Sequence, residues 1–216
     1  MKIRILLVYV LIFFVGCAND SVYSELYRNL TNLIKGPQNI SQEVIDKVPY
    51  ASMQARLGNS NNSLIVLEED RNDILKWTTS NFVKIYTQNG FVIRLTGLGN
   101  ELQRIDLDRN HPAISAKFPE NEINLTSFYS FENPQLFRLP VKTVFYYEKN
   151  EEIIILGKKI QSKVYYEKSI KNLISWKFEN KYWVNEDNEI VQSVQYFSPK
   201  NPPIHLRTTK KYKKPI

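Results

Sequence analysis

The sequence contains a single cysteine, Cys17, among its 216 residues, and this scarcity excludes two kinds of site. One thiol cannot form a disulfide bond within the chain, so the fold must be stable without one. It also cannot supply the several thiolates of a structural zinc site. Histidine is nearly as rare, since only His111 and His205 are present, and neither lies in a recognisable nucleophile motif. Because no His, Cys or acidic residues recur at ligand spacing, we expect no metal and no cofactor.

Long hydrophobic runs and glycine-rich loops are missing as well. The apolar run at residues 5–15 is shorter than the roughly 20 residues that a helix needs to cross a bilayer, and no later segment approaches that length. We therefore expect no transmembrane helix in the mature chain. Residues 96–100 contain two glycines but lack the strand, three-glycine turn and helix of a dinucleotide-binding fingerprint. A phosphate-binding loop is not expected either.

What the N-terminus does contain is typical of a secretion signal. Lys2 and Arg4 provide positive charge, the apolar residues 5–15 follow, and Gly16 is a small residue at the position expected for cleavage. These features predict that residues 1–16 are a signal peptide.

Residues 14–17, Phe-Val-Gly-Cys, resemble the bacterial lipobox, in which the cysteine becomes the acylated first residue after cleavage. The resemblance implies that Cys17 carries several acyl chains, palmitate among them, which together hold a protein on a membrane stably. Ala18 follows the cysteine, which implies an address at the outer membrane, on its periplasmic side. The alternatives are a single-pass anchor, or an ordinary signal peptide with an incidental cysteine.

The charge of the chain is positive and concentrated near its C-terminus. The formal net charge is +7 at pH 7, and the C-terminal segment HLRTTKKYKKPI holds five of the basic residues. Such a cluster attracts anionic glycan, lipid phosphate or nucleic acid, or it is simply a solvated tail. Because no helix-turn-helix, zinc-finger or RNA-binding motif is present, we expect no nucleic-acid partner.

Two helical patterns lie in the N-terminal segment of the mature chain, residues 17–49. Apolar residues recur at three- and four-residue spacing over residues 23–34, and a Gly-Pro pair follows them as a stop signal. This predicted helix can pack on or into a sheet, or lie against the membrane beside the anchor. A second, shorter helical turn is predicted at residues 41–47.

From residue 50 onward, strand patterns dominate. Most aromatic residues are Tyr and Phe, which favour pleated, half-buried surfaces. Residues 81–87 and 91–97 flank Gln-Asn-Gly, in which Asn89 and Gly90 favour the positive φ angles of a tight hairpin turn. The other predicted strands, separated mostly by short polar turns, lie at residues 50–58, 63–70, 141–149, 152–158, 163–169, 173–184, 189–198 and 204–210.

The spacing of these strands predicts a mainly β fold. We expect an antiparallel sheet over residues 50–216 that forms a closed or half-closed barrel, with the N-terminal helix packed on or into it. Residues 104–133 have few alternating runs and are interpreted as a long excursion within the sheet. The mature chain, residues 17–216, is thus predicted to be a single periplasmic domain.

Two facing carboxyl groups are enough for glycoside hydrolysis, so the acidic residues are the main enzymatic candidates. Glu167, Glu179, Asp106 and Asp108 are available for such a pair. Other acids crowd strand ends and turns, where solvated charge normally lies. We expect that the chain is not an enzyme.

Two segments carry a family resemblance. Residues 76–102 contain a strand with a tryptophan that leads through an Asn-Gly turn into Arg-Leu-Thr-Gly-Leu. Residues 176–211 contain Asn-Lys-Tyr-Trp-Val-Asn, a turn, Ser-Val-Gln, a proline break and a closing basic strand. Together with the lipobox and the leading helix, these segments resemble the group 4 capsule polysaccharide lipoprotein family (GfcB/YjbF). The resemblance implies a β-rich periplasmic lipoprotein that is encoded with machinery for capsule or exopolysaccharide secretion and has no established catalytic residues.

Five residues within these segments are candidates for binding glycan or a partner protein: Trp77, Arg94, Trp183, Ser193 and Gln195. If Arg94 and Gln195 face into a concave sheet, they can hydrogen-bond sugar hydroxyl or carboxylate groups while a tryptophan stacks on a sugar face. If they face outward, they are ordinary strand surface.

The sequence therefore predicts an outer-membrane-anchored periplasmic lipoprotein that is a non-enzymatic accessory in capsule or exopolysaccharide secretion or assembly. Its expected partners are the membrane, through the N-terminal lipid, and a polysaccharide or polysaccharide-export proteins. The alternative is a periplasmic carrier or sensor that binds a lipid or other apolar ligand in a half-barrel cavity. A continuous apolar cavity favours the carrier, whereas a shallow cleft with Trp, Arg and Gln at its floor favours glycan binding.

Overall fold

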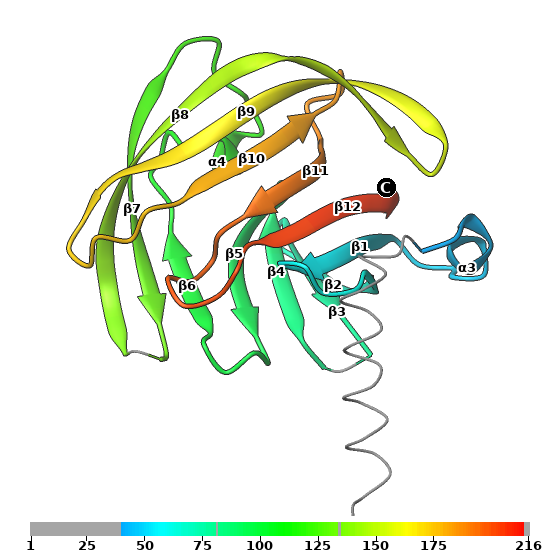
Figure 1. The fold of residues 1–216 in the computed structure, drawn as a ribbon, viewed down its shortest axis with the longest axis horizontal. Helices are drawn as coiled ribbons and strands as arrows, with labels where there is room; N and C mark the ends of the chain where they lie inside the picture. Colours follow the sequence, from blue (N-terminus) through cyan, green and yellow to red (C-terminus); the bar gives the residue numbers. More distant parts are fainter. Residues whose placement is uncertain (1–39, 81, 134, 214–216) are drawn as a thin grey trace, which may run out of the picture. The chain divides into compact units, whose positions relative to one another are not determined.

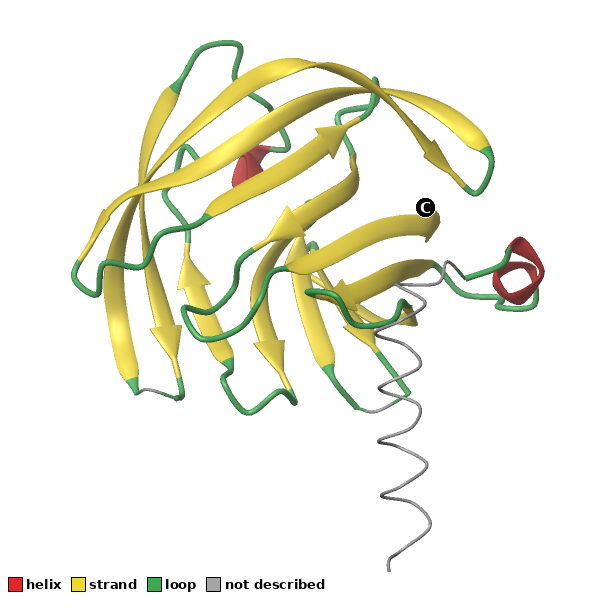
Figure 2. Ribbon diagram, in the orientation of Figure 1, coloured by secondary structure: helices red, strands yellow, loops and turns green. Residues whose placement is uncertain are grey.

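Twelve β-strands form a closed barrel in the computed structural model, which describes residues 40–80, 82–133 and 135–213 (Figures 1 and 2). Each strand pairs in antiparallel fashion with the next strand along the chain, and β1 pairs with β12 to close the ring. The strands are β1 (Ser52–Leu57), β2 (Ser63–Arg71), β3 (Ile74–Thr78), β4 (Lys84–Gln88), β5 (Phe91–Thr96), β6 (Leu102–Asp106), β7 (Ile123–Phe131), β8 (Leu136–Ile155), β9 (Lys158–Asn172), β10 (Glu179–Val184), β11 (Ile190–Gln195) and β12 (Ile204–Lys210).

Closure of the ring confirms the predicted mainly β, antiparallel barrel. Of the two predicted forms, closed and half-closed, the barrel has the closed one. The closing register runs from Leu57 opposite Ile204 to Ser52 opposite Lys210, with one irregularity beside Ser52. This pairing leaves neither β1 nor β12 with an unpaired outer edge, which is the usual benefit of a closed barrel. The predicted signal peptide, the lipidated cysteine and the helix expected at residues 23–34 all lie outside the described residues.

Apolar side chains fill the interior of the barrel. A first cluster includes Ile65, Leu95, Leu102 and Val141, none of which is exposed to solvent. A second cluster surrounds Phe145, which is likewise fully buried. Burial of each large side chain of this kind contributes about 1.5–3 kcal/mol, so these clusters are the main source of stability.

The short helical turn expected at residues 41–47 is confirmed as α3 (Gln42–Asp46). Ser41 occupies the N-cap position, and Ile45 is its buried residue. The side-chain amide of Gln54 in β1 donates to the Ile40 carbonyl (3.3 Å), which ties the start of the helix to the sheet. Within the part of the chain that the structure describes, no helix has both the length and the apolar character needed to span a membrane.

The excursion interpreted at residues 104–133 contains more regular structure than expected. It holds the end of β6, all of β7 and, between them, the short helix α4 (Pro112–Ser115). Ala113 of α4 is fully buried in the second interior cluster, and the side-chain amide of Asn89 donates to its carbonyl (2.8 Å). The excursion therefore closes the barrel at the end where the turn between β4 and β5 lies.

The long hairpin of β8 and β9 corrects the predicted strand boundaries. Two strands were expected at residues 141–149 and 152–158, but β8 continues through the polar residues between them. The turn instead lies at Leu156 and Gly157, whose φ angles of 51° and 75° suit a tight hairpin connection. A run of Asn and Glu is a turn signal only when no partner strand continues beside it, and here Glu151 pairs with Ser162.

The strand expected at residues 173–184 begins later than its pattern indicates. Residues 173–178 form a loop, and the strand β10 starts at Glu179. Two hydrogen bonds from the side chain of Asn172 fix the backbone of this loop at Trp176. The Asn172 Oδ1 accepts from the Trp176 backbone N–H (2.8 Å), and the Nδ2 donates to the Trp176 carbonyl (2.6 Å). Trp176 is thereby turned into the interior cluster without forming part of a strand.

The tip of the β8–β9 hairpin covers an apolar patch on the outer wall. Tyr182 of β10 belongs to the interior, so the next residue, Trp183, points to the opposite face. Ile153 and Ile155 of the hairpin belong to the same cluster as Trp183 and Val191, and Trp183 is only 6% exposed. Figure 1 shows the hairpin continuing past the end of β10. The β8–β9 hairpin thus shields Trp183, which points out of the barrel, from solvent.

Candidate functional site

A groove of about 750 Å³ on the outer wall is the candidate site that the geometry favours. It crosses the strands β2 to β6. Trp77 and Leu95 are buried in the interior, so the residues next to them in the alternation, Lys76 and Arg94, face outward and line the groove. Tyr86 of β4 lines it as well.

Four groove residues form one row across the strands. Glu69 lies opposite Lys76, Lys76 opposite Tyr86, and Tyr86 opposite Arg94 in the register of the sheet. Arg71 lies two residues further along β2 and lines the same groove. Because neighbouring strands are about 4.8 Å apart, the row from β2 to β5 spans ~14 Å.

The two acidic residues that line the groove, Glu69 and Asp106, are already paired, and so is Glu68 beside it. The Lys76 ammonium lies 2.6 Å from the Glu68 carboxylate and 3.6 Å from that of Glu69. The hydrogen bond from Lys76 lowers the pKa of Glu68. Asp106 is held between the guanidinium groups of Arg104 and Arg138.

Two arginines of the groove, Arg71 and Arg94, are exposed and form no ion pair with any described residue. The Arg94 guanidinium carbon lies 5.0 Å from the centre of the Tyr86 ring, which is a cation–π contact. The groove therefore presents two positive charges and an aromatic ring on an open surface.

Of the predicted binding residues, Arg94 lines this groove, and Trp77 lies beneath it on the inner face of the sheet. Trp77 is buried, and its indole N–H donates to the Thr87 hydroxyl (2.9 Å). Its ring is therefore part of the core rather than a platform for a sugar.

Ser193 and Gln195 point into the barrel. The Gln195 side chain accepts from the Val92 backbone N–H (2.8 Å) and donates to the Gly90 carbonyl (3.0 Å) and to the Ser193 hydroxyl (2.8 Å). Strands β11 and β5 are not neighbours in the ring, so the bonds from Gln195 to Val92 of β5 and to Gly90 just before it cross the interior. Ser193 and Gln195 are 1% and 3% exposed, and Trp183 lies under the β8–β9 hairpin, so the five predicted residues do not converge on one site.

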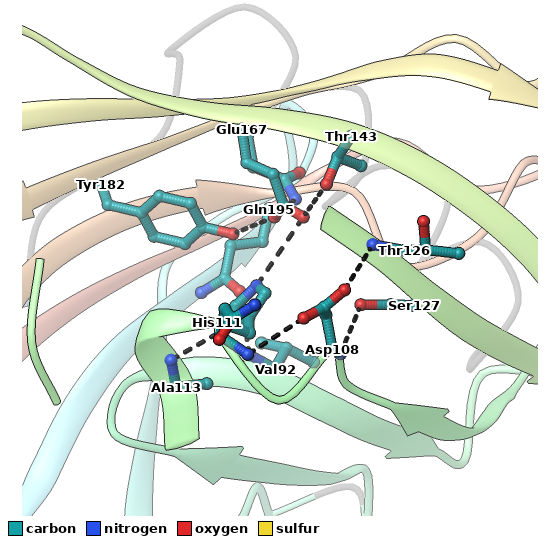
Figure 3. A network of polar contacts seen from close by, with 12 residues as sticks. Val92, Asp108, His111, Ala113, Thr126, Ser127, Thr143, Glu167, Tyr182 and Gln195 are labelled. Carbon is teal, nitrogen blue, oxygen red and sulfur yellow. Dashed lines mark hydrogen bonds and ion pairs between the residues drawn. The ribbon is translucent and has the colours of Figure 1, made fainter. Parts of the chain in front are cut away.

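A second polar cluster lies inside the barrel around Glu167, which is 3% exposed (Figure 3). The Thr143 hydroxyl donates to one carboxylate oxygen (3.0 Å), and the Asn180 amide and the Tyr182 hydroxyl donate to the other (3.1 Å each). The His111 Nε2 lies 3.7 Å from the first oxygen. Every neighbour of the carboxylate is a donor, as an ionised acid requires.

His111 lies just before α4, in the excursion at residues 104–133 that closes one end of the barrel, and it connects this segment to the Glu167 carboxylate. Its Nδ1 accepts the Ala113 backbone N–H (3.0 Å), which leaves the ring proton on the Nε2 that faces Glu167. Burial alone would raise the pKa of Glu167, but the interactions with His111, Asn180 and Thr143 outweigh burial and hold the pKa below its ordinary value. The same burial and the nearby carboxylate charge raise the pKa of the Tyr182 hydroxyl well above its usual range.

The four acids considered for hydrolysis occupy different environments. Glu167 is enclosed by protein donors, whereas Asp106 lies on the outer wall between two arginines. Asp108 accepts the backbone N–H groups of Asn110 (3.0 Å) and Thr126 (2.9 Å), and these bonds overcome the effect of burial and lower its pKa. Glu179 is exposed at the start of β10. Glu167 and Asp106 therefore do not face each other across one cleft.

Sequence reasoning missed Tyr86, Arg71 and the pairing of His111 with Glu167. The alternation in β4 contained a signal for Tyr86, because it lies between the apolar Ile85 and the inward Thr87 and must face the other way. No local signal joins His111 to Glu167, since the two residues are far apart in the sequence. Among the described residues, no group of three or more His, Cys, Asp or Glu is arranged to hold a metal ion.

The chain is similar to a solved structure and to a protein family. The fold is similar to that of the hypothetical lipoprotein YmcC from Escherichia coli (K12), with a TM-score of 0.66 and 19% sequence identity over 80% of this chain and 90% of that chain. At this identity the likeness concerns the fold alone. No curated protein matches the sequence. The family model described as group 4 capsule polysaccharide lipoprotein gfcB, YjbF matches residues 23–208, so this chain belongs to that family.

Proposed function

We propose that this protein is a lipoprotein anchored through Cys17 at the periplasmic side of the outer membrane, where it assists capsule or exopolysaccharide secretion or assembly. It acts by binding glycan or an export protein, without catalysing a reaction. The chain belongs to a family of group 4 capsule polysaccharide lipoproteins, which supports a role in capsule or exopolysaccharide secretion or assembly. The observation that carries the binding role is the outer groove, where Arg71 and Arg94 have no ionic partner among the described residues.

The filled interior supports a role at the outer wall over the alternative of a carrier. A carrier for a lipid needs an apolar cavity large enough to enclose its ligand. The inner positions of the barrel are instead taken by packed side chains such as Leu95, Leu102 and Val141, each with no exposed surface.

The surroundings of the acidic residues support a role without catalysis. The Glu167 carboxylate receives hydrogen bonds from three side chains and is shut off from solvent. A general acid or base must reach a proton on the substrate, and this group has no open direction in which to do so.

Deletion of the gene tests the proposal. We expect the deletion strain to carry less surface polysaccharide, and the wild-type gene to restore it. A gene with both Arg71→Ala and Arg94→Ala should restore it poorly although the protein accumulates normally, because both side chains are exposed. The matched control is Arg109→Ala, since Arg109 is exposed but lies outside the groove lining. Unchanged surface polysaccharide in the deletion strain would refute the proposed function.

A further inference from the structure

We propose that the outer groove binds a carboxylated oligosaccharide segment, with a sugar ring stacked on Tyr86, one carboxylate paired with Arg94 and a second acidic sugar held by Arg71. This inference rests on the proposed function and names the class of ligand for its binding site. It concerns an acidic glycan chain rather than a neutral one.

The charge of the groove favours an anionic ligand. Its lining contains four cationic side chains and two carboxylates, which leaves a formal excess of two positive charges. The carboxylates of Glu69 and Asp106 are each in contact with a cation, whereas Arg71 and Arg94 have no anionic partner among the described residues. An arginine presents a planar fork of N–H donors that matches a carboxylate in two parallel hydrogen bonds. The unmatched positive charge is therefore on the side-chain type best suited to uronic acids.

The contact between Arg94 and Tyr86 explains how the charge and the aromatic ring act together. The guanidinium lies over the ring, with its carbon 5.0 Å from the ring centre. Cation–π contacts at exposed sites are weak, so a carboxylate competes effectively for the guanidinium. Movement of Arg94 toward the carboxylate frees the face of Tyr86 for the C–H face of the same sugar.

The remaining walls of the groove fit a chain of sugars. Ile74, Ile93 and Ile114 contribute apolar surface for sugar C–H groups, and Gln88 contributes an amide for hydroxyl groups. Arg71 on β2 and Arg94 on β5 lie three strand spacings apart across the sheet, or ~14 Å, and are offset by two residues, or ~7 Å, along the strands. A separation of this size suits successive residues of a polymer better than one monosaccharide.

Binding of defined oligosaccharides tests the inference. The full chain, purified from membranes in detergent, is titrated with trigalacturonate and with maltotriose, which is a neutral oligomer of the same length. We expect trigalacturonate to bind at least about tenfold more tightly than maltotriose. Raising the salt concentration from ~0.05 to ~0.5 M should weaken the binding of trigalacturonate and leave that of maltotriose unchanged, because the charges are exposed.

Variants assign the contacts to individual residues. Arg94→Ala and Arg71→Ala should each weaken trigalacturonate binding by about tenfold, and Arg94→Lys should fall between Arg94→Ala and wild type because it keeps the charge without the fork. Tyr86→Leu should lose affinity, whereas Tyr86→Phe should keep it. Arg109→Ala should bind as wild type does. Unchanged urea midpoints for these variants would show that each loss reflects the groove and not the fold.

Three outcomes would overturn the inference: equal affinity for the neutral and acidic trimers, wild-type affinity in both arginine variants, or no binding at all. A fourth is displacement of trigalacturonate by inorganic phosphate at equal charge concentration, which would identify a general anion site without selectivity for glycans. None of these results alters the deletion phenotype, so failure of this inference is distinguishable from failure of the proposed function.

Discussion

At the scale of single residues, Glu167 is the buried charge on which the inner polar cluster depends. Its carboxylate accepts hydrogen bonds from side chains of the two strands that flank its own β9, namely β8 and β10. It also faces His111, which lies just before the helix α4. Removing the charge would leave several buried donors without an acceptor, and an unsatisfied buried group costs more than the net gain of one hydrogen bond.

We therefore expect Glu167→Gln to lower the free energy of unfolding by about 1–3 kcal/mol, because the new NH₂ group faces donors where the carboxylate accepted. Urea unfolding followed by circular dichroism measures this change. The matched control is Glu148→Gln on β8, an exposed site, where the change should stay within about 0.5 kcal/mol. Equal stability of the two variants would show that the buried network contributes nothing.

The pKa of Glu167 also predicts how stability changes with pH. Despite burial, the interactions with His111, Asn180 and Thr143 keep this pKa below the ordinary value of 4.5. A carboxyl group whose pKa is lower in the folded state stabilises the fold fully above its unfolded pKa, and this contribution fades as the pH falls through the folded pKa.

The difference in unfolding free energy between wild type and Glu167→Gln should thus be constant between pH 7 and about pH 5 and shrink below about pH 4.5. Urea titrations at a series of pH values measure it. A difference that grows on acidification would mean that the pKa is raised by burial instead.

At the scale of elements, the turn between β4 and β5 connects two distant parts of the barrel. Gly90 has a φ of +83°, and a Cβ atom at this position would lie 2.8 Å from the Cβ of Ile190 in β11. The carbonyl of Gly90 also accepts from Gln195 (3.0 Å). Both the backbone conformation and the space therefore require glycine here.

We expect Gly90→Ala to destabilise the fold by the ~1–2 kcal/mol of a left-handed backbone plus a further ~1–3 kcal/mol of overpacking. Gly99→Ala isolates the first contribution, because Gly99 has a φ of +76° and nothing lies within 4 Å of its Cβ position. Thermal or urea unfolding of the two variants gives the comparison. If both lose the same stability, the approach to Ile190 is not a constraint.

The β8–β9 hairpin is a second element with a testable contribution. Simultaneous Ile153→Ala and Ile155→Ala should cost about 2 kcal/mol or more per site and open Trp183 to solvent, because both isoleucines pack in the patch that covers it. Acrylamide quenching of tryptophan fluorescence measures this exposure. The same substitutions in a chain that also carries Trp183→Phe give the signal of the other two tryptophans, and the difference belongs to Trp183. Ile154→Ala is the control, since Ile154 is 59% exposed and lies between the two. Quenching that is no greater in the double variant than in this control would contradict the packing.

At the scale of the whole molecule, we expect the proposed lipid anchor at Cys17 and the barrel to be separable. Cys17→Ser should move the protein from the membrane fraction to the soluble fraction and abolish labelling with radioactive palmitate, because no acyl chain can be attached. Cell fractionation and labelling measure these effects. Full restoration of surface polysaccharide by this variant in the deletion strain would show that tethering is dispensable, and membrane association without the thiol would refute the lipid anchor.

Much of the fold could be predicted because its signals are local. Alternation of apolar and polar residues indicated most of the strands, and the Asn89–Gly90 turn lies where its sequence predicts it, between β4 and β5. The weak pattern at residues 104–133 concealed β7, because the polar Ser127 occupies an inward position and the apolar Phe128 beside it faces outward. It also concealed the helix α4, because the burial of Ala113 comes from partners far along the chain. The same limit applies to the site, where Arg94 was identified but Arg71, on the other side of the groove, was not.

The sequence by itself determined the family, the antiparallel barrel class and the expectation of a lipidated N-terminus, since each depends on patterns of neighbouring residues. The tertiary structure alone decided which candidates face outward. Phe91 and Val92 are both buried, and the register of β5 against β4 shifts beyond Val92, so Arg94 lies on the outer wall. Gln195 of β11 faces inward and bonds the Val92 backbone of β5. Alternation states only that successive residues face opposite ways, and closure of the ring between β1 and β12 defines which of the two faces is the inside.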